Sequence, residues 1–358
     1  MIRYKLYKRL YDKRFTFQPH RLTIENFQDN EGGFFELKKS TFVSTLLIIL
    51  FAITASFAGA KALYETKPVP KGERHSITEI ISPDSKWEKI TTGSGFMEGI
   101  NFDRKGDIWM VSPPTGEILK VKDEKAVRVG ETYKMPIGAK FHQDGRLFVT
   151  DGMGELYAYN PATGKRKIIV NSYNGKPFNG LNDLVFDDKG GLYFTEPMGS
   201  SATHPTGRVF YLPPNSSEAV LFSENIAYPN GIAISADGQR VYISEFDKNQ
   251  ILSVPSMTAE KSPETPFVFA RFEGGIGPDG LTVDSEGNLY VAHFQAGEVV
   301  VVDKSGFKVG NIRLPEDAGT FVTNLAFHDG HLYVTESSKN TVWRIKVNKT
   351  GLQPYGLK

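Results

Sequence analysis

Six copies of one hydrophobic and polar pattern follow one another along the chain. Each copy has a short apolar strand, a tight turn containing Asp or Gly, and a second strand rich in Tyr, Phe and Val, as in FDRKGDIWMV around Gly106 and FDDKGGLYFT around Gly190. The copies begin 39, 45, 48, 49 and 45 residues apart, which is the length of a four-stranded propeller blade. The pattern predicts an all-β fold, a six-bladed β-propeller, in which Trp87-Glu88-Lys89-Ile90 completes the last blade.

One position at the start of the first strand of each copy is usually polar. In chain order it holds Glu98, Ile137, Asn182, Asn230, Asp279 and, in the shorter last copy, Asn324. The first strand of a blade is innermost and lines the channel, so we expect these side chains to face one another at one mouth. A packed core would not select oxygen-bearing side chains at five of six such positions.

Two carboxylates and several amide carbonyl groups at one point make a site of hard oxygen donors. Such donors favour Ca²⁺, with Mg²⁺ or Mn²⁺ as alternatives and Zn²⁺ the least suited. We therefore predict that Glu98, Asn182, Asn230 and Asp279 bind one divalent ion. The competing interpretation is that Asn and Asp only cap strand starts and turns, as they commonly do.

Four motifs around these residues resemble the SGL family of senescence marker protein, gluconolactonase and luciferin-regenerating-enzyme-like proteins. They are Met97-Glu98-Gly99, Leu181-Asn182-Asp183-Leu184, Pro229-Asn230-Gly231-Ile232 and Gly277-Pro278-Asp279-Gly280. The likeness covers about residues 87–347, and KFHQDGRLFV from Lys140 is similar to bacterial lactonases of the family. The resemblance implies a six-bladed propeller with one catalytic metal ion, usually calcium, whose ligands fall on the same four residues.

Members of this family hydrolyse lactones, so the resemblance implies a small lactone or ester as substrate. A bound divalent ion polarises a lactone carbonyl and stabilises the developing oxyanion. Asp279 is the candidate catalytic base, because a carboxylate beside the metal can orient or deprotonate water. Glu98 is expected to hold the metal. Asp183 suggests a second ion, but Gly99 stands where a partner acid would be needed, and we predict one ion only.

Three further side chains are candidates for substrate binding: His293, His204 and Asn324. His293 fills, in the fifth copy, a strand-end position that is otherwise acidic, and a purely structural role is the alternative. His204 lies in the loop 197–206, which is expected to overhang the same mouth. The acids that share the position of His293 are expected to make hydrogen bonds between blades; they are Asp151, Glu196, Glu245 and Glu336.

The N-terminal part of the chain predicts a membrane anchor. Residues 40–60 carry no charge over a length that spans a bilayer, and Lys and Arg precede them. We expect residues 1–39 to be a cytoplasmic tail, residues 61–86 a stalk, and residues 87–350 a hydrolase domain outside the cytoplasm, periplasmic or extracellular. The alternative is secretion after cleavage of a signal peptide near Ala60.

Composition limits the alternatives further. A formal net charge of +1 and a pI near 7.8 do not suggest a nucleic-acid partner, and the chain contains no cysteine. No protein partner follows from the sequence. Two readings compete with a lactonase: a phosphotriesterase or strictosidine-synthase-like enzyme on the same fold, and a non-enzymatic binding propeller built from NHL-like repeats.

Overall fold

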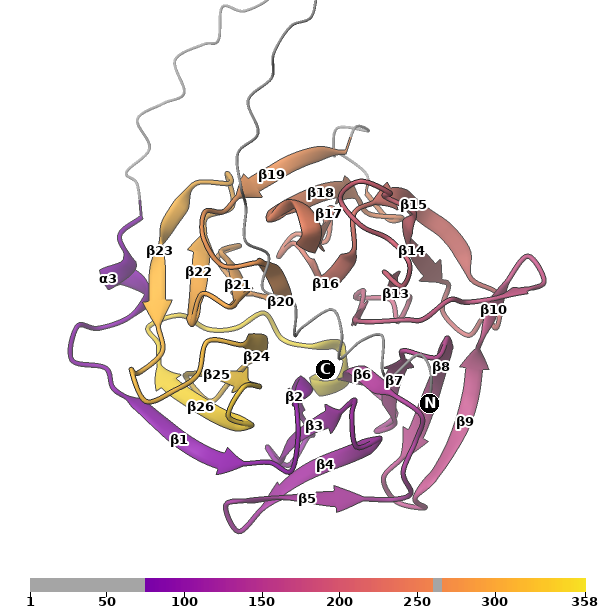
Figure 1. Ribbon diagram of the computed structural model, residues 1–358, viewed down its shortest axis with the longest axis horizontal. Coiled ribbons are helices and arrows are strands. Elements are labelled where there is room, and N and C mark those ends of the chain that lie inside the picture. Colours follow the sequence, from indigo (N-terminus) through magenta and orange to yellow (C-terminus); the bar gives the residue numbers. More distant parts are fainter. Residues whose placement is uncertain (1–74, 260–265) are drawn as a thin grey trace, which may run out of the picture. The chain divides into compact units, whose positions relative to one another are not determined.

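The computed structural model describes residues 75–259 and 266–358, which form a ring of blades around a central channel (Figure 1). Within these residues there are six four-stranded antiparallel sheets, and they follow one another around the ring in chain order. The six-bladed propeller predicted from the repeats is therefore confirmed.

The strands of each blade run from the channel outward. Blade 1 comprises β2 (Glu98–Phe102), β3 (Ile108–Ser112), β4 (Glu117–Lys122) and β5 (Lys125–Val129). Blade 2 comprises β6 (Pro136–Phe141), β7 (Leu147–Asp151), β8 (Glu155–Asn160) and β9 (Lys165–Val170). Blade 3 comprises β12 (Leu184–Phe186), β13 (Leu192–Glu196), β14 (Gly207–Leu212) and β15 (Val220–Ile226). Blade 4 comprises β16 (Pro229–Ile234), β17 (Arg240–Glu245), β18 (Gln250–Pro255) and β19 (Phe267–Arg271).

The last two blades complete the ring. Blade 5 comprises β20 (Gly277–Val283), β21 (Leu289–Phe294), β22 (Glu298–Val302) and β23 (Lys308–Arg313). Blade 6 comprises β24 (Val322–His328), β25 (His331–Glu336), β26 (Thr341–Lys346) and β1 (Trp87–Thr92). The short elements outside the blades are β10 (Ser172–Tyr173), β11 (Lys176–Pro177), α3 (Ile77–Ile80) and the 3₁₀ helices η1 (Phe246–Lys248) and η2 (Tyr355–Leu357).

Apolar side chains between adjacent blades form the core. One cluster joins Phe148 and Leu156 of blade 2 to Phe194 and Phe210 of blade 3. The innermost strands β2 and β16 are buried along their whole length, whereas the outermost strands β5 and β9 are largely exposed. Each blade thus buries both faces against its neighbours, and the ring is a closed stack of sheets.

Strand β1 closes the ring as the sequence predicts. It pairs with β26 in an antiparallel ladder, with Trp87 opposite Ile345 and Thr92 opposite Thr341. The indole Nε1 of Trp87 also donates a hydrogen bond to the Arg313 carbonyl oxygen of blade 5 at 2.7 Å. Pairing the first strand with the last blade covers the edge of β26 and joins both ends of the domain in one sheet.

The predicted Asp and Gly turns join the first two strands of the blades. In blade 3, Asp187 Oδ1 accepts hydrogen bonds from the backbone N–H groups of Lys189 (2.9 Å) and Gly191 (2.7 Å). Gly190 has φ +85°, a conformation that glycine adopts without a steric penalty. These local bonds explain why the same residues recur in the turns.

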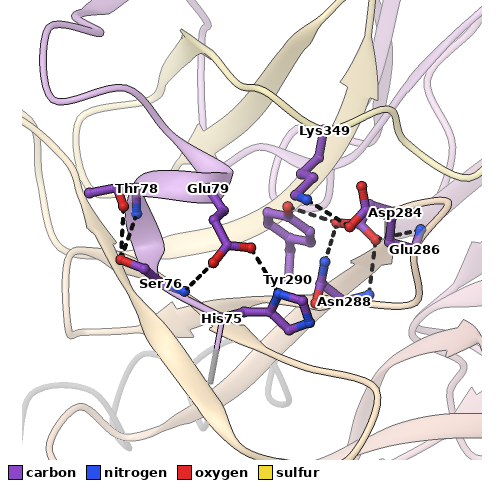
Figure 2. A network of polar contacts seen from close by, with 9 residues as sticks. All are labelled: His75, Ser76, Thr78, Glu79, Asp284, Glu286, Asn288, Tyr290 and Lys349. Carbon is purple, nitrogen blue, oxygen red and sulfur yellow. Dashed lines mark hydrogen bonds and ion pairs between the residues drawn. The ribbon is translucent and has the colours of Figure 1, made fainter. Parts of the chain in front are cut away.

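Helix α3 leads the chain into the propeller beside β23 (Figure 1). Ser76 and Glu79 form a capping box at its start, and Ile80 is buried among side chains of blades 5 and 6. Figure 2 shows this cap beside a turn of blade 5, where Lys349 pairs with Glu286 (2.6 Å). The Ile80 carbonyl oxygen accepts a hydrogen bond from the backbone of residue 348, so α3 is fastened to the end of the chain.

The C-terminal strap, residues 348–358, crosses the channel on the side of the first-hairpin turns. The backbone N–H of Leu352 donates to the Val283 carbonyl oxygen at 2.9 Å, and the Tyr355 ring packs against Phe186 with centroids 5.4 Å apart. Figure 1 shows the C-terminal end near the middle of the ring. The strap and the inner strands together line a cavity of about 410 Å³, which we call the far cavity.

The predicted tail, membrane segment and most of the stalk lie outside the described residues. In the part of the chain that the structure describes, no helix is both long enough and apolar enough to cross a membrane.

Candidate channel site

The predicted site residues lie at the starts of the inner strands, beside β-bulges. The ladder between β2 and β3 shifts directly after Glu98, and the ladders of β16 and β20 shift around Asn230 and Asp279. A bulge bends its strand and re-aims the side chains, and bulges are frequent beside functional sites. Asn182 stands two residues before β12. All four side chains are buried, with at most 9% of each residue exposed.

Glycines after the site residues let the inner strands of adjacent blades approach closely. A Cβ atom on Gly231 would lie 2.1 Å from the carbonyl oxygen of Asp279, and one on Gly280 would lie 2.7 Å from Cγ of Asn324. Both distances are far below van der Waals contact, so a larger residue would push the blades apart. The backbone that carries Asp279 is therefore fixed by packing from both sides.

Hydroxyl groups on the second strands tie the site backbone to the preceding blade. Thr195 Oγ1 of blade 3 donates to the carbonyl oxygen of Asn230 at 2.8 Å, and Ser244 Oγ of blade 4 donates to that of Asp279 at 2.7 Å. Thr150 Oγ1 of blade 2 likewise donates a hydrogen bond to the carbonyl oxygen of Asn182. In blades 2, 3 and 4 the inter-blade hydrogen bonds expected of the strand-end acids are thus made by the residue before each acid. In blade 6 the hydroxyl groups of Thr323 and Ser337 donate to the Met97 carbonyl oxygen instead.

The strand-end acids accept hydrogen bonds from the backbone of the segment that leads into their own blade. Asp151 accepts a hydrogen bond from the backbone N–H of Met135 at 3.0 Å, and Glu245 accepts one from Ala227 at 2.9 Å. Met135 directly precedes the inner strand of blade 2, and Ala227 lies two residues before that of blade 4. These acids therefore support the strands that carry the site.

Blade 6 departs from the expected register, because Thr323 and not Asn324 takes the position of Asp279. The backbone N–H of Asn324 donates to Thr335 Oγ1 at 2.9 Å, as that of Asp183 donates to Thr195 at 3.0 Å. The side chains of both residues also accept a bond from the next backbone N–H at 2.9 Å. Asn324 is therefore the counterpart of Asp183, one residue beyond the predicted position.

The short last hairpin explains this difference. His328 pairs with His331 across a two-residue turn, whereas Phe102 pairs with Ile108 in blade 1. Counting back from the turn glycine consequently reaches a different residue in the last copy. Asn324 still joins the site, because its Nδ2 lies 3.4 Å from Glu98 Oε2.

Asp183 is a third carboxylate in the channel, beyond the four residues predicted to bind the metal ion. It is 2% exposed and accepts hydrogen bonds from the backbone N–H groups of Leu184 (2.9 Å) and Ile232 (3.4 Å). A signal for it was present in the sequence. Asp183 stands where four other blades have glycine after the site position, namely Gly99, Gly138, Gly231 and Gly280.

The three carboxylates repel one another in a buried environment. Burial raises the pKa of Glu98 to about 8, and the negative charge of Asp183 adds to this effect. Burial, followed by repulsion from Glu98 and Asp183, raises the pKa of Asp279 well above its usual value, and a hydrogen bond from Asn230 opposes this. None of the ion pairs within residues 75–259 and 266–358 includes any of these carboxylates.

This charge pattern fits a divalent cation. Uncompensated buried carboxylates cost free energy, and a hard cation relieves it when carboxylate and amide oxygens surround the ion. Within the described residues, no group of three or more His, Cys, Asp or Glu side chains could hold a metal ion without other ligands. The fit therefore depends on carboxylates of Glu98 and Asp279 together with the amides of Asn182 and Asn230.

The two candidate histidines lie in different environments. His293 is 1% exposed, its Nε2 is 3.0 Å from Asn249 Oδ1, and its Nδ1 is 4.0 Å from Glu298 Oε1. Burial lowers the pKa of His293. His204 is exposed in the loop 197–206, where its backbone bonds to Ser201. The substrate contacts of both histidines and of Asn324 stay predictions.

Two curated lactonases are similar to this chain in sequence. The lactonase drp35 of Staphylococcus epidermidis is 31% identical over 261 residues, which cover 68% of this chain and 79% of that protein. The lactonase drp35 of Staphylococcus aureus is 32% identical over 264 residues, which cover 68% of this chain and 80% of that protein.

Solved structures share the fold. A gluconolactonase from Xanthomonas campestris superposes with a TM-score of 0.66 at 22% identity, covering 76% of this chain and 92% of its own. A calcium-binding regucalcin from Agrobacterium tumefaciens superposes with a TM-score of 0.63 at 20% identity, covering 74% and 95%. The protein-family model described as the SMP-30/gluconolactonase/LRE-like region matches residues 96–338 of this chain. These residues include the whole channel site. The chain therefore belongs to the SMP-30/gluconolactonase/LRE-like (SGL) family.

Proposed function

We propose that this protein is a divalent-metal-dependent lactonase. The metal ion binds in the propeller channel, and Ca²⁺ is the first candidate. The observation that carries the proposal is the group of buried carboxylates, Glu98, Asp183 and Asp279, which lack a compensating ion pair among the described residues. The relatives named lactonases support a lactone as substrate.

The bound metal would supply Lewis acidity, polarising the lactone carbonyl and stabilising the oxyanion that develops during hydrolysis. Glu98, Asn182, Asn230 and Asp279 would hold it. Asp279 is also the proposed base. A carboxylate beside the metal can accept a proton from the attacking water, and the amide of Asn230 donates a hydrogen bond that orients it.

The remaining residues keep this arrangement in place. Asn324 fixes the carboxylate of Glu98, and Asp183 fixes the backbone of Ile232 in the neighbouring blade. The C-terminal strap covers the far side of the channel, so that substrate would enter from the mouth where the site residues lie. Water access would then be limited to one side.

The proposal is tested by metal removal and substrate choice together. Full-length protein treated with a chelator is assayed against a panel of aliphatic, aromatic and sugar lactones and of phosphotriesters, before and after Ca²⁺, Mg²⁺ or Mn²⁺ is restored. We expect lactone hydrolysis that disappears with the metal and returns with Ca²⁺. Metal-dependent cleavage of phosphotriesters alone would replace the lactonase proposal, and metal binding without hydrolysis would favour a binding propeller.

The membrane location is a second proposal, based on the charge-free residues 40–60 and the basic segment before them. The hydrolase domain would lie outside the cytoplasm, anchored by this segment. Reporter fusions and protease protection on intact cells test the orientation. Protection of the domain inside the cell would contradict it, whereas a mature N-terminus near Lys61 would indicate secretion after cleavage.

A further inference from the structure

Lys140 places a positive charge in the inner ring of strands. It lies in β6, three residues after Ile137, the apolar residue at the site position of blade 2. The residues at the same distance from the site position in the other blades are uncharged: Asn101, Val185, Ala233, Thr282 and Ala326. Blade 2 therefore contributes no metal ligand but does contribute a cation.

The structure puts Lys140 between the channel site and the far cavity. The residue is half-buried and lines the far cavity together with Phe141 and Thr282. Burial raises the pKa of both Glu98 and Asp183, and the positive charge of Lys140 opposes this rise. Within the described part of the chain, no carboxylate comes within ion-pair distance of its ammonium group. Lys140 thus acts on the site as a nearby charge and not as a direct partner.

The charges at this end of the channel balance only when Lys140 is counted. One divalent ion leaves a single negative charge on three ionised carboxylates, and the ammonium group of Lys140 has the opposite charge. In a buried site with weak solvent screening, such a charge acts over several ångströms. It attracts the carboxylates and repels the metal ion.

We propose that Lys140 is a positioning residue that provides a fixed counter-charge beneath the metal site. It holds the carboxylates together in the metal-free protein and keeps metal affinity lower than the ligands alone would give. This inference rests on the proposed function, because it requires a divalent ion at Glu98 and Asp279.

Calorimetric titration of the full-length protein with Ca²⁺ at about pH 8.5, where protons compete least with metal, tests the inference. Lys140→Met is expected to bind Ca²⁺ on the order of tenfold more tightly than the wild type, because a repelling charge is gone. Lys140→Arg keeps the charge and is expected to bind like the wild type. Metal-free Lys140→Met is expected to melt at a lower temperature, and Ca²⁺ to restore most of the difference.

The control is Lys165→Met, which removes an exposed charge at the start of β9, the outermost strand of the same blade. It is expected to leave both readouts unchanged. A purely packing role predicts weaker or equal Ca²⁺ binding in Lys140→Met, and that result overturns the inference. Lys140→Gln provides the same test if the methionine variant does not fold. A wild-type protein that binds no divalent ion would overturn the proposed function and this inference together.

Discussion

Replacing Gly231 by alanine tests whether packing between blades positions the site. The added Cβ would lie 2.1 Å from the Asp279 carbonyl oxygen and 2.8 Å from Gly280 Cα, whereas ordinary contacts begin at 3.4 Å. The inner strand of blade 5 must therefore move by more than 1 Å (3.4 − 2.1 Å). Overpacking of this kind costs about 1–3 kcal/mol, and losing the Ser244 bond to Asp279 adds about 1 kcal/mol.

We expect Gly231→Ala to lose about 2–4 kcal/mol of unfolding free energy, a fall in Tm of roughly 5–10 °C, measured by calorimetry. Because the shift moves Asp279 itself, Ca²⁺ affinity should fall as well. The matched control is Gly238→Ala in the hairpin turn of the same blade, where φ is +71° and no atom lies within 4 Å. It should cost about 1 kcal/mol and leave Ca²⁺ binding unchanged. Wild-type stability and affinity in Gly231→Ala would refute the reasoning.

Two other outcomes follow from the structure. The pKa of Glu98 is raised from 4.5 to about 8, so the metal-free folded state binds more protons than the unfolded state; its stability is expected to fall as the pH rises from about 4.5 to 8. Saturating Ca²⁺ should remove most of this fall in thermal melts, and a flat profile without metal would contradict the assignment. Deleting residues 353–358 takes the Tyr355 ring off Phe186 and opens the far cavity, which should cost about 2–4 kcal/mol in urea unfolding. Ca²⁺ affinity is expected to change little, and a large loss of affinity would show that the strap supports the site directly.

The ring of blades was predictable from the sequence because each blade repeats the same pattern of strand and turn residues. A turn aspartate such as Asp187 binds its own backbone, and a glycine such as Gly190 takes the left-handed conformation, so the repeat is visible without tertiary information. The closing strand at Trp87 followed from counting strands. The C-terminal strap could not be found in this way, because residues 348–358 follow no repeat and are held by contacts to several blades.

The places of Glu98 and Asp279 near the starts of inner strands were predictable, because both residues occupy a repeated position. The prediction failed where the repeat changes length, since the two-residue turn at His328 shifts Asn324 by one position. Asp183 was not predicted to join this site, because its neighbour Asn182 already filled the expected place. The effect of the Lys140 charge on the pKa of Glu98 depends on the folded channel, which spacing along the chain does not reveal.

The central claim is that hydrolysis depends on one divalent ion held by the channel carboxylates. The most direct measurement is lactone hydrolysis by chelator-treated protein across a Ca²⁺ titration, for the wild type, Glu98→Gln and Asp279→Asn. The wild type should regain activity with Ca²⁺, and Glu98→Gln should need more Ca²⁺ and recover in part. Asp279→Asn should stay roughly 10²–10⁴-fold slower even at saturating Ca²⁺, because it lacks the base. Full activity without metal, or undiminished activity in Asp279→Asn, would contradict the claim.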